Sequence, residues 1–157
     1  MIRAAQPADA AALAALWNPW IRDTAVTFNA AEKTEADLRA MIAARNCFLV
    51  YINNGLQGFA TYDQFRGGTG YATCMEHTVI LAPTARGMGA GRALMAAVED
   101  HAQAAGAHQM IAGVSGENPE GRRFHTALGY HEIAIIRDAG FKFGRFMDLV
   151  LMQKFLA

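Results

Sequence analysis

Three glycines alternate with other residues directly after an apolar run, in Arg86-Gly87-Met88-Gly89-Ala90-Gly91. The apolar run predicts a strand and the following residues predict a helix, so the glycines lie where a helix begins. N–H groups in the first turn of a helix have no partner within it, and the helix dipole favours anions there. Because glycine leaves these N–H groups uncovered, the segment predicts an anion site suited to a phosphate group.

A P-loop, a dinucleotide-binding turn and tight helix packing each account less well for the glycines. A P-loop requires Gly-Lys followed by Ser or Thr, and this chain has Gly91-Arg92-Ala93 instead. A dinucleotide fingerprint is G-x-G-x-x-G near the start of a βαβ unit, whereas G-x-G-x-G occurs late in this chain. Tight helix packing alone is a poor reason for three glycines, because each costs roughly 1 kcal/mol relative to alanine inside a helix.

The composition is that of one globular domain, which we expect to span residues 1–157. The chain is 53% hydrophobic and 18% charged, and its 14 basic residues balance its 14 acidic residues. This balance gives no field for nucleic acid or an anionic membrane, so any anion must be bound locally. No apolar run is long enough to span a membrane, and no signal peptide is evident. Cys47 and Cys74 lack metal or redox spacing, so we expect reduced thiols, no metal and a cytoplasmic location.

The N-terminal part predicts a strand and two helices. The strand covers Ile2–Ala5, and the first helix starts at Pro7. Asn18-Pro19 should break or kink that helix. Thr34 with Asp37 resembles a capping box at the start of the second helix. The apolar residues that share a face of the first helix are Leu13, Leu16, Trp17 and Trp20.

The remainder predicts six more strands and two more helices. Asn53-Asn54-Gly55 is a strong hairpin signal, and the glycine-rich segment 66–70 predicts a loop. Asn118 is the expected N-cap of the last helix. The expected strands are 48–52, 56–62, 71–81, 110–114, 133–136 and 147–152, and the expected helices are 89–105 and 119–128. Strands and helices alternate while one pair forms a hairpin, so the fold class is α/β (α+β) with a mixed sheet.

The glycine segment resembles the Q/R-x-x-G-x-G/A signature of the GNAT superfamily of N-acetyltransferases. Further segments are similar to the phosphinothricin and methionine sulfoximine acetyltransferase subgroup. They are Thr24–Phe28, Glu76-His77-Thr78-Val79, Glu117-Asn118, His125, Leu128-Gly129-Tyr130 and Phe141–Gln153. The resemblance implies a homodimeric acyltransferase that moves an acetyl group from acetyl-CoA directly to the amine of a small amino-acid-like molecule.

The resemblance also implies a fold and a donor site. The sheet would have seven mostly antiparallel strands, about four flanking helices, and a splay between the strands ending at Leu81 and Val114. The central strand would pair with the pantetheine arm, and the glycine loop would hold the pyrophosphate. The implied donor-binding residues are Val79, Ile80, Leu81, Arg86, Gly87, Met88, Gly89, Ala90, Gly91, Arg92 and Asn118. Alternatively, the apolar residues belong only to the core, Arg86 is solvated and Asn118 only caps its helix.

Two residues are implied as catalytic. Glu76 is the candidate general base, because an ammonium must lose a proton before its nitrogen can attack. The alternative is that Glu76 pairs with Arg66 or Arg145. His77 points to the opposite face by strand alternation, where we expect a hydrogen-bonded structural histidine. His125 lies where the family places a group that protonates the departing thiolate, or it is only a packed helix residue.

The acceptor site is less defined by the sequence. Phe28 and the aromatic residues of 141–146 would wall the pocket or lie in the core or a dimer surface, and Arg66 or Tyr71 would receive a substrate carboxylate. The chain departs from the subgroup in the glycine-rich loop 66–70, and Gly121 replaces a common serine. Two further functions stay open: acetylation of protein or peptide amines, and a non-catalytic acyl-CoA sensor. Neutral charge weighs against the first, and Glu76 weighs against the second.

Overall fold

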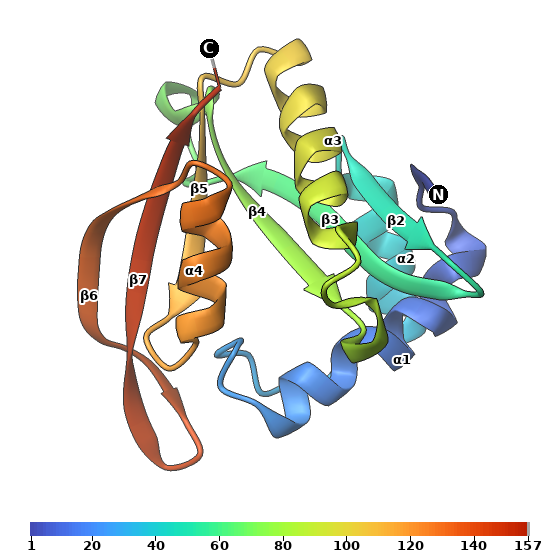
Figure 1. Ribbon diagram of the computed structural model, residues 1–157, viewed down its shortest axis with the longest axis horizontal. Helices are drawn as coiled ribbons and strands as arrows, with labels where there is room; N and C mark the ends of the chain where they lie inside the picture. Colours follow the sequence, from blue (N-terminus) through green and yellow to red (C-terminus); the bar gives the residue numbers. More distant parts are fainter. Residues whose placement is uncertain (157) are drawn as a thin grey trace.

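The computed structural model describes residues 1–156 and contains a single seven-stranded sheet with helices on both faces (Figure 1). The strands are β1 (Ile2–Ala4), β2 (Phe48–Ile52), β3 (Leu56–Gln64), β4 (Cys74–Leu81), β5 (Gln109–Ser115), β6 (His131–Lys142) and β7 (Arg145–Phe155). The α-helices are α1 (Ala10–Asp23), α2 (Glu35–Ala44), α3 (Ala90–Ala104) and α4 (Pro119–Ala127). Short 3₁₀ turns are η1 (Pro7–Asp9), η2 (Thr69–Tyr71) and η3 (Pro83–Ala85).

The strand order is β1-β2-β3-β4-β5-β7-β6, and only β4 and β5 run parallel. Their pairing covers only three residue pairs and ends at Glu76 opposite Ile111. Beyond that point the two strands diverge, so the second half of β4 has no partner on the β5 side. The expected mixed sheet and the splay between these strands are both confirmed.

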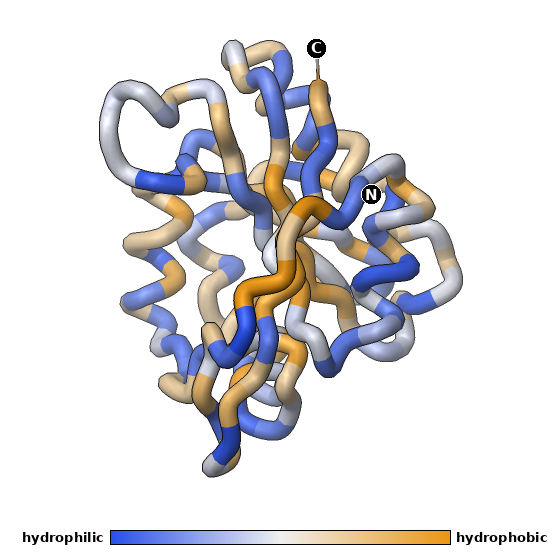
Figure 2. The backbone as a smooth tube through the Cα atoms, turned by 90° about the vertical axis from the view of Figure 1, so that its left-hand side faces the viewer, coloured by the Kyte–Doolittle hydropathy of each residue, from blue (hydrophilic) through white to orange (hydrophobic). Residues whose placement is uncertain are grey.

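Two hydrophobic cores lie on opposite faces of the sheet. Helices α1 and α2 pack over Phe59, while α3 covers Ala60 on the other face, as strand alternation requires. Figure 2 views the molecule from the side of β6 and β7 and shows hydrophobic stretches along the chain near the middle of this view. Within residues 1–156, no helix combines the length and the apolar character needed to cross a membrane.

The predicted break at Pro19 is wrong, because α1 continues through it. Trp17 and Ile21 are buried on either side of the proline. The Asn18 amide group also accepts a hydrogen bond from the Lys33 N–H and donates one to its carbonyl, at 2.8 and 2.9 Å. Tertiary contacts on both sides therefore outweigh the hydrogen bond that proline removes.

Three strands differ from their predicted bounds by more than two residues at one or both ends. β4 starts at Cys74 because η2 occupies the residues before it. β6 and β7 are much longer than 133–136 and 147–152, and they meet at a tight turn where Phe143 and Gly144 have positive φ. The pairing register shifts between Ile136 and Gly140, where Asp138 has φ 54°. The strand therefore continues through a bulge at this point.

Candidate active site

A cavity of about 430 Å³ lies at the splay between β4 and β5. Its walls come from both strands, from the end of β3 and from the segment after α1. The lining residues include Val26, Thr27, Phe28, Arg45, Asp63, Glu76, His77, Val79, Gly113, Asn118 and His125. Segments from several parts of the chain therefore converge on one site.

Glu76 is the carboxylate nearest the point where β4 and β5 separate. Its oxygen lies so close to Gly113 that a Cβ on that residue would be 2.8 Å from it. Burial raises the pKa of Glu76 above its usual range. The predicted alternative partners are engaged elsewhere: Arg145 binds Glu117 at 2.6 Å, and the Arg66 guanidinium lies over the Tyr71 ring.

His77 and His125 form a buried pair beside this cavity. Their Nε2 atoms are 3.0 Å apart and their rings stack at 5.0 Å between centroids. His77 thus faces helix α4 and is hydrogen-bonded, as its strand alternation predicts. Burial lowers the pKa of His77 to about 3 and lowers that of His125 from its ordinary value.

The neighbours of the pair define its neutral tautomers. His125 Nδ1 lies 2.7 Å from the Gly121 carbonyl, which only accepts, so this nitrogen carries the proton. His125 Nε2 then accepts, and His77 Nε2 donates to it. His77 Nδ1 is consequently the one acceptor left, and it has no partner among the described residues. In the neutral pair, both nitrogens of His125 are occupied.

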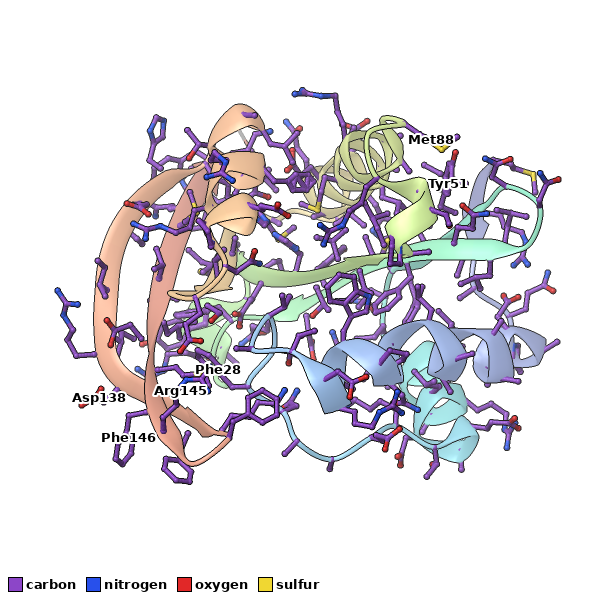
Figure 3. All side chains as sticks on the ribbon, turned by 60° about the horizontal axis from the view of Figure 1, so that its bottom comes forward. Phe28, Tyr51, Met88, Asp138, Arg145 and Phe146 are labelled. Atoms are coloured by element: carbon purple, nitrogen blue, oxygen red, sulfur yellow. The ribbon has the colours of Figure 1, made fainter. Side chains whose placement is uncertain are left out.

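A second cavity, of about 350 Å³, adjoins the first and follows the glycine loop. The two cavities share Val26, Val79, Ile80, Asn118 and His125. The lining of the second also includes Leu81, Arg86, Gly87, Gly89, Ala90, Gly91, Arg92 and Gly121. Met88, by contrast, is 56% exposed and does not line it. In Figure 3, Met88 and Phe28 lie in different parts of the molecule.

The glycine loop has the features of an anion site. Gly87 and Gly89 have φ of 75° and 78°, and Gly89 caps α3 without a side-chain hydrogen bond to the first-turn N–H groups. A Cβ at either glycine would meet no atom within 4 Å, so the space above them is open. Gly91 is different, since a Cβ there would press on Phe124 and Leu81. Gly87 and Gly89 therefore allow the loop conformation, and Gly91 allows close packing of α3 against Phe124 and Leu81.

Two residues at the rim of the second cavity have partners of their own. Arg86 forms an ion pair with Glu120 at 2.8 Å, and its guanidinium lies 5.1 Å from the Trp20 ring centroid. Asn118 accepts a hydrogen bond from the Gly121 N–H at 3.0 Å. The expected helix cap is confirmed, and Arg86 is held at the loop by both neighbours.

Lys142 fixes the segment that carries Phe28. Its ammonium is almost fully buried and donates to the carbonyls of Thr24 and Thr27, each at 2.7 Å. The Phe28 ring also packs so closely on Gly140 that no larger residue fits there. Figure 3 shows Phe28 beside the arm formed by β6 and β7. The acceptor-side wall is therefore clamped to that arm.

Arg66 and Tyr71 are not brought to either cavity, because the glycine-rich loop carries them outward. Arg45 and Asp63 line the first cavity instead, and sequence patterns did not indicate them. Arg45 follows the last residue of α2, so only the packing of that helix places it at the site. Within residues 1–156, no group of acidic, histidine or cysteine side chains is arranged to hold a metal.

Comparison with known proteins gives one consistent family. Residues 13–130 match the Acetyltransferase (GNAT) family. An L-methionine sulfoximine/L-methionine sulfone acetyltransferase of Salmonella typhimurium is 34% identical, covering 97% of this chain and 92% of the relative. The L-amino acid N-acyltransferase MnaT of Escherichia coli is 35% identical, covering 97% and 91%.

Solved structures agree with these relatives. A Salmonella typhimurium structure with its cofactor acetyl-CoA is 33% identical and superposes with a TM-score of 0.94, covering 100% of this chain and 94% of the other. A phosphinothricin acetyltransferase of Sinorhizobium meliloti in complex with acetyl-CoA is 28% identical, also with a TM-score of 0.94, covering 100% and 88%.

Proposed function

Because the chain belongs to the GNAT acetyltransferase family, we propose that it transfers an acetyl group from acetyl-CoA to the primary amine of a small amino-acid-like molecule. Acceptors of the methionine sulfoximine or phosphinothricin type are the first candidates, since relatives and a solved neighbour are named for them. The observation that carries the proposal is the half-buried Glu76 carboxylate in the first cavity, which adjoins the second cavity along Val79 and Ile80 of the same strand.

The second cavity is proposed to hold the donor, which supplies the acetyl thioester. The first-turn N–H groups of α3 and the side chains of Arg86 and Arg92 suit the pyrophosphate. The unpaired edge of β4, from Val79 to Leu81, suits an extended arm that adds to it as a strand would. Gly87, Gly89, Ala90 and Gly91 complete this site, while Met88 does not line it.

Glu76 is proposed as the general base. At neutral pH an alkyl ammonium is mostly protonated, and its nitrogen has no lone pair until one proton leaves. A carboxylate with a raised pKa binds such a proton more strongly than an exposed one does. Because described side chains do not neutralise Glu76 by an ion pair, its charge attracts the ammonium group.

His125 is proposed to return a proton to the thiolate, because its side chain lines both cavities. In the neutral pair its two nitrogens are engaged, so this role requires one additional proton on the His77–His125 pair. We therefore expect His125→Gln to reduce turnover most at acidic pH and little at pH 8. An equal loss at every pH would assign His125 a packing role.

The protein is proposed to be a cytoplasmic homodimer. The edge strand β6 and the turn after it expose apolar side chains that a second copy would cover. They are Ile133, Ile135, Ile136, Phe141 and Phe143, with Phe146 on β7. This feature supports an interface there, because β6 is an edge strand and carries several large exposed apolar residues.

One assay tests the proposed function. The protein is incubated with acetyl-CoA and a panel of amines, and free thiol is followed with time. We expect release with L-methionine sulfoximine, L-methionine sulfone or phosphinothricin, and an acetylated product of matching mass. Release only with peptides ending in a free amine would favour the protein-acetylating alternative. Tight acetyl-CoA binding without turnover of any amine would favour a sensor.

A further inference from the structure

The acceptor cavity has an asymmetric set of charges. Its lining contains two carboxylates, Asp63 and Glu76, and His77 and His125 are buried with pKa values below their ordinary range. Among the described residues that line this cavity, Arg45 is the single permanent cation. The cavity therefore offers an ammonium group two anionic neighbours, and offers an anionic group one cationic neighbour.

The three charged residues follow one another across the site. Asp63 and Glu76 are directly opposite on β3 and β4, so their side chains share one face with Cβ atoms roughly 5 Å apart. Arg45 Nε lies 3.7 Å from the Asp63 carboxylate. Glu76, Asp63 and Arg45 thus form a short row, with the candidate base at one end and the guanidinium at the other.

The Arg45 guanidinium has hydrogen-bond donors without an acceptor among the described residues. Its contact with Asp63 is longer than a charge-assisted hydrogen bond, and its two terminal nitrogens have no acceptor among the described residues. The side chain is only 22% exposed, and its partner is 69% exposed. A guanidinium presents parallel N–H groups that match the two oxygens of a carboxylate.

Resting on the proposed function, we infer that Arg45 receives the carboxylate of an amino-acid acceptor while Glu76 faces its ammonium group. A zwitterion then meets a complementary charge at each end of the row. Asp63 disfavours a second anionic group between them and helps to hold the guanidinium in place. Arg66 and Tyr71, the two residues that the sequence suggests for this role, contact each other outside the cavity.

The inference predicts selectivity for acceptors that carry a carboxylate next to the amine. An amine without it would leave the Arg45 guanidinium unpaired in a partly closed site. Hydrogen bonds to charged groups are strong enough that losing them should lower kcat/KM by roughly 10- to 100-fold. The loss should appear mainly in KM, because the carboxylate is remote from the bond that forms.

The test compares L-methionine sulfone with the amine that has the same side chain but no carboxylate. Arg45→Met keeps the aliphatic stem and removes the charge, so kcat/KM for the amino acid should fall about 10- to 100-fold while that for the amine changes little. Arg45→Lys should recover part of the loss. Arg39→Met is the matched control, because Arg39 lies on α2, which ends directly before Arg45, but binds Glu35 at the surface.

Each result has a distinct meaning. Equal effects of Arg45→Met on both acceptors, or none on the amino acid, would overturn the inference although the proposed function stands. A selective loss in Arg66→Met, with Arg45→Met unaffected, would assign the carboxylate to the loop instead. If the parent protein acetylates neither acceptor nor any other amino acid, the proposed function fails, and the inference fails with it. Melting temperature and acetyl-CoA affinity, measured on every variant, show that the fold and donor site are intact.

Discussion

Replacing one carboxylate oxygen of Glu76 by an amide nitrogen separates the chemical role of this side chain from its role in packing. Glu76→Gln keeps the shape and removes the proton acceptor. General-base assistance is typically worth about 10² to 10⁴ in rate, so turnover at neutral pH should fall within that range. The loss should shrink as pH rises, because more of the acceptor then arrives deprotonated. The measurement is a pair of pH–rate profiles with one amino-acid acceptor, together with acetyl-CoA affinity, which should not change.

The buried His77 predicts a stability that depends on pH. Its pKa is lowered from 6.5 to about 3 in the folded protein, so the unfolded chain binds more protons between these values. Above about pH 6.5 His77 is neutral in both states and does not affect the free energy of unfolding. Below that pH, the free energy of unfolding falls by about 1.4 kcal/mol per pH unit as pH decreases towards 3. His77→Gln retains a donor for His125 but does not titrate, so its unfolding free energy should fall less steeply between about pH 6.5 and 4.5. If the unfolding free energies of the two proteins fall equally steeply with pH across this interval, His77 is not the group responsible.

At the scale of single elements, the start of α3 is the clearest feature. Gly89→Ala adds a Cβ that meets no protein atom within 4 Å. The free energy of unfolding should therefore fall only by the cost of a left-handed conformation at alanine, about 1 kcal/mol. The same atom would stand over the first-turn N–H groups, and acetyl-CoA affinity should fall at least about tenfold. Gly55→Ala is the matched control, because Gly55 also has positive φ and open space but lies in the β2–β3 turn. Calorimetry that finds equal affinity in the two variants would remove the loop from the donor site.

The segment after α1 depends on a single ammonium group. Lys142→Met leaves the carbonyls of Thr24 and Thr27 without their donor, at a cost of about 2–3 kcal/mol. Phe28 should then be less well placed, so KM for the acceptor should rise while acetyl-CoA affinity stays constant. Arg137→Met on the same strand is the control, since Arg137 is largely exposed. Unchanged KM and unchanged melting temperature in Lys142→Met would show that the clamp is dispensable.

Elements with local signals were predictable from the sequence, and residues placed by tertiary packing were not. Gly87 and Gly89 indicate the loop because their positive φ is a backbone property of the segment itself. Thr34 and Asp37 form the capping box expected from their spacing. Arg45 gives no such signal, because its place at the cavity depends on how α2 packs. The full length of β6 gives no such signal either, because the strand continues to Lys142 only through the register shift around Asp138.

At the scale of the whole molecule, the splay between β4 and β5 explains why one cavity can adjoin another. The strands pair only up to Glu76, so the carboxylate lies at the last closed position of the sheet and the open half of β4 follows it. Gly113 on β5 leaves room for that carboxylate. The donor and acceptor cavities can then meet at residues of one strand, which is the arrangement that direct transfer between two bound molecules requires.

The edge of the sheet gives the last prediction, which concerns assembly. β6 is an outer strand, and an exposed apolar edge strand favours association with another copy. Light scattering at micromolar concentration should give about twice the chain mass of 16.9 kDa. Ile135→Lys places a charge in the apolar surface and should shift the protein towards the monomer without loss of secondary structure. Met88→Lys is the control, because Met88 is also apolar and exposed but lies away from β6 (Figure 3). A parent protein that scatters as a single chain, or an Ile135→Lys dimer as stable as the parent, would place the interface elsewhere or exclude it.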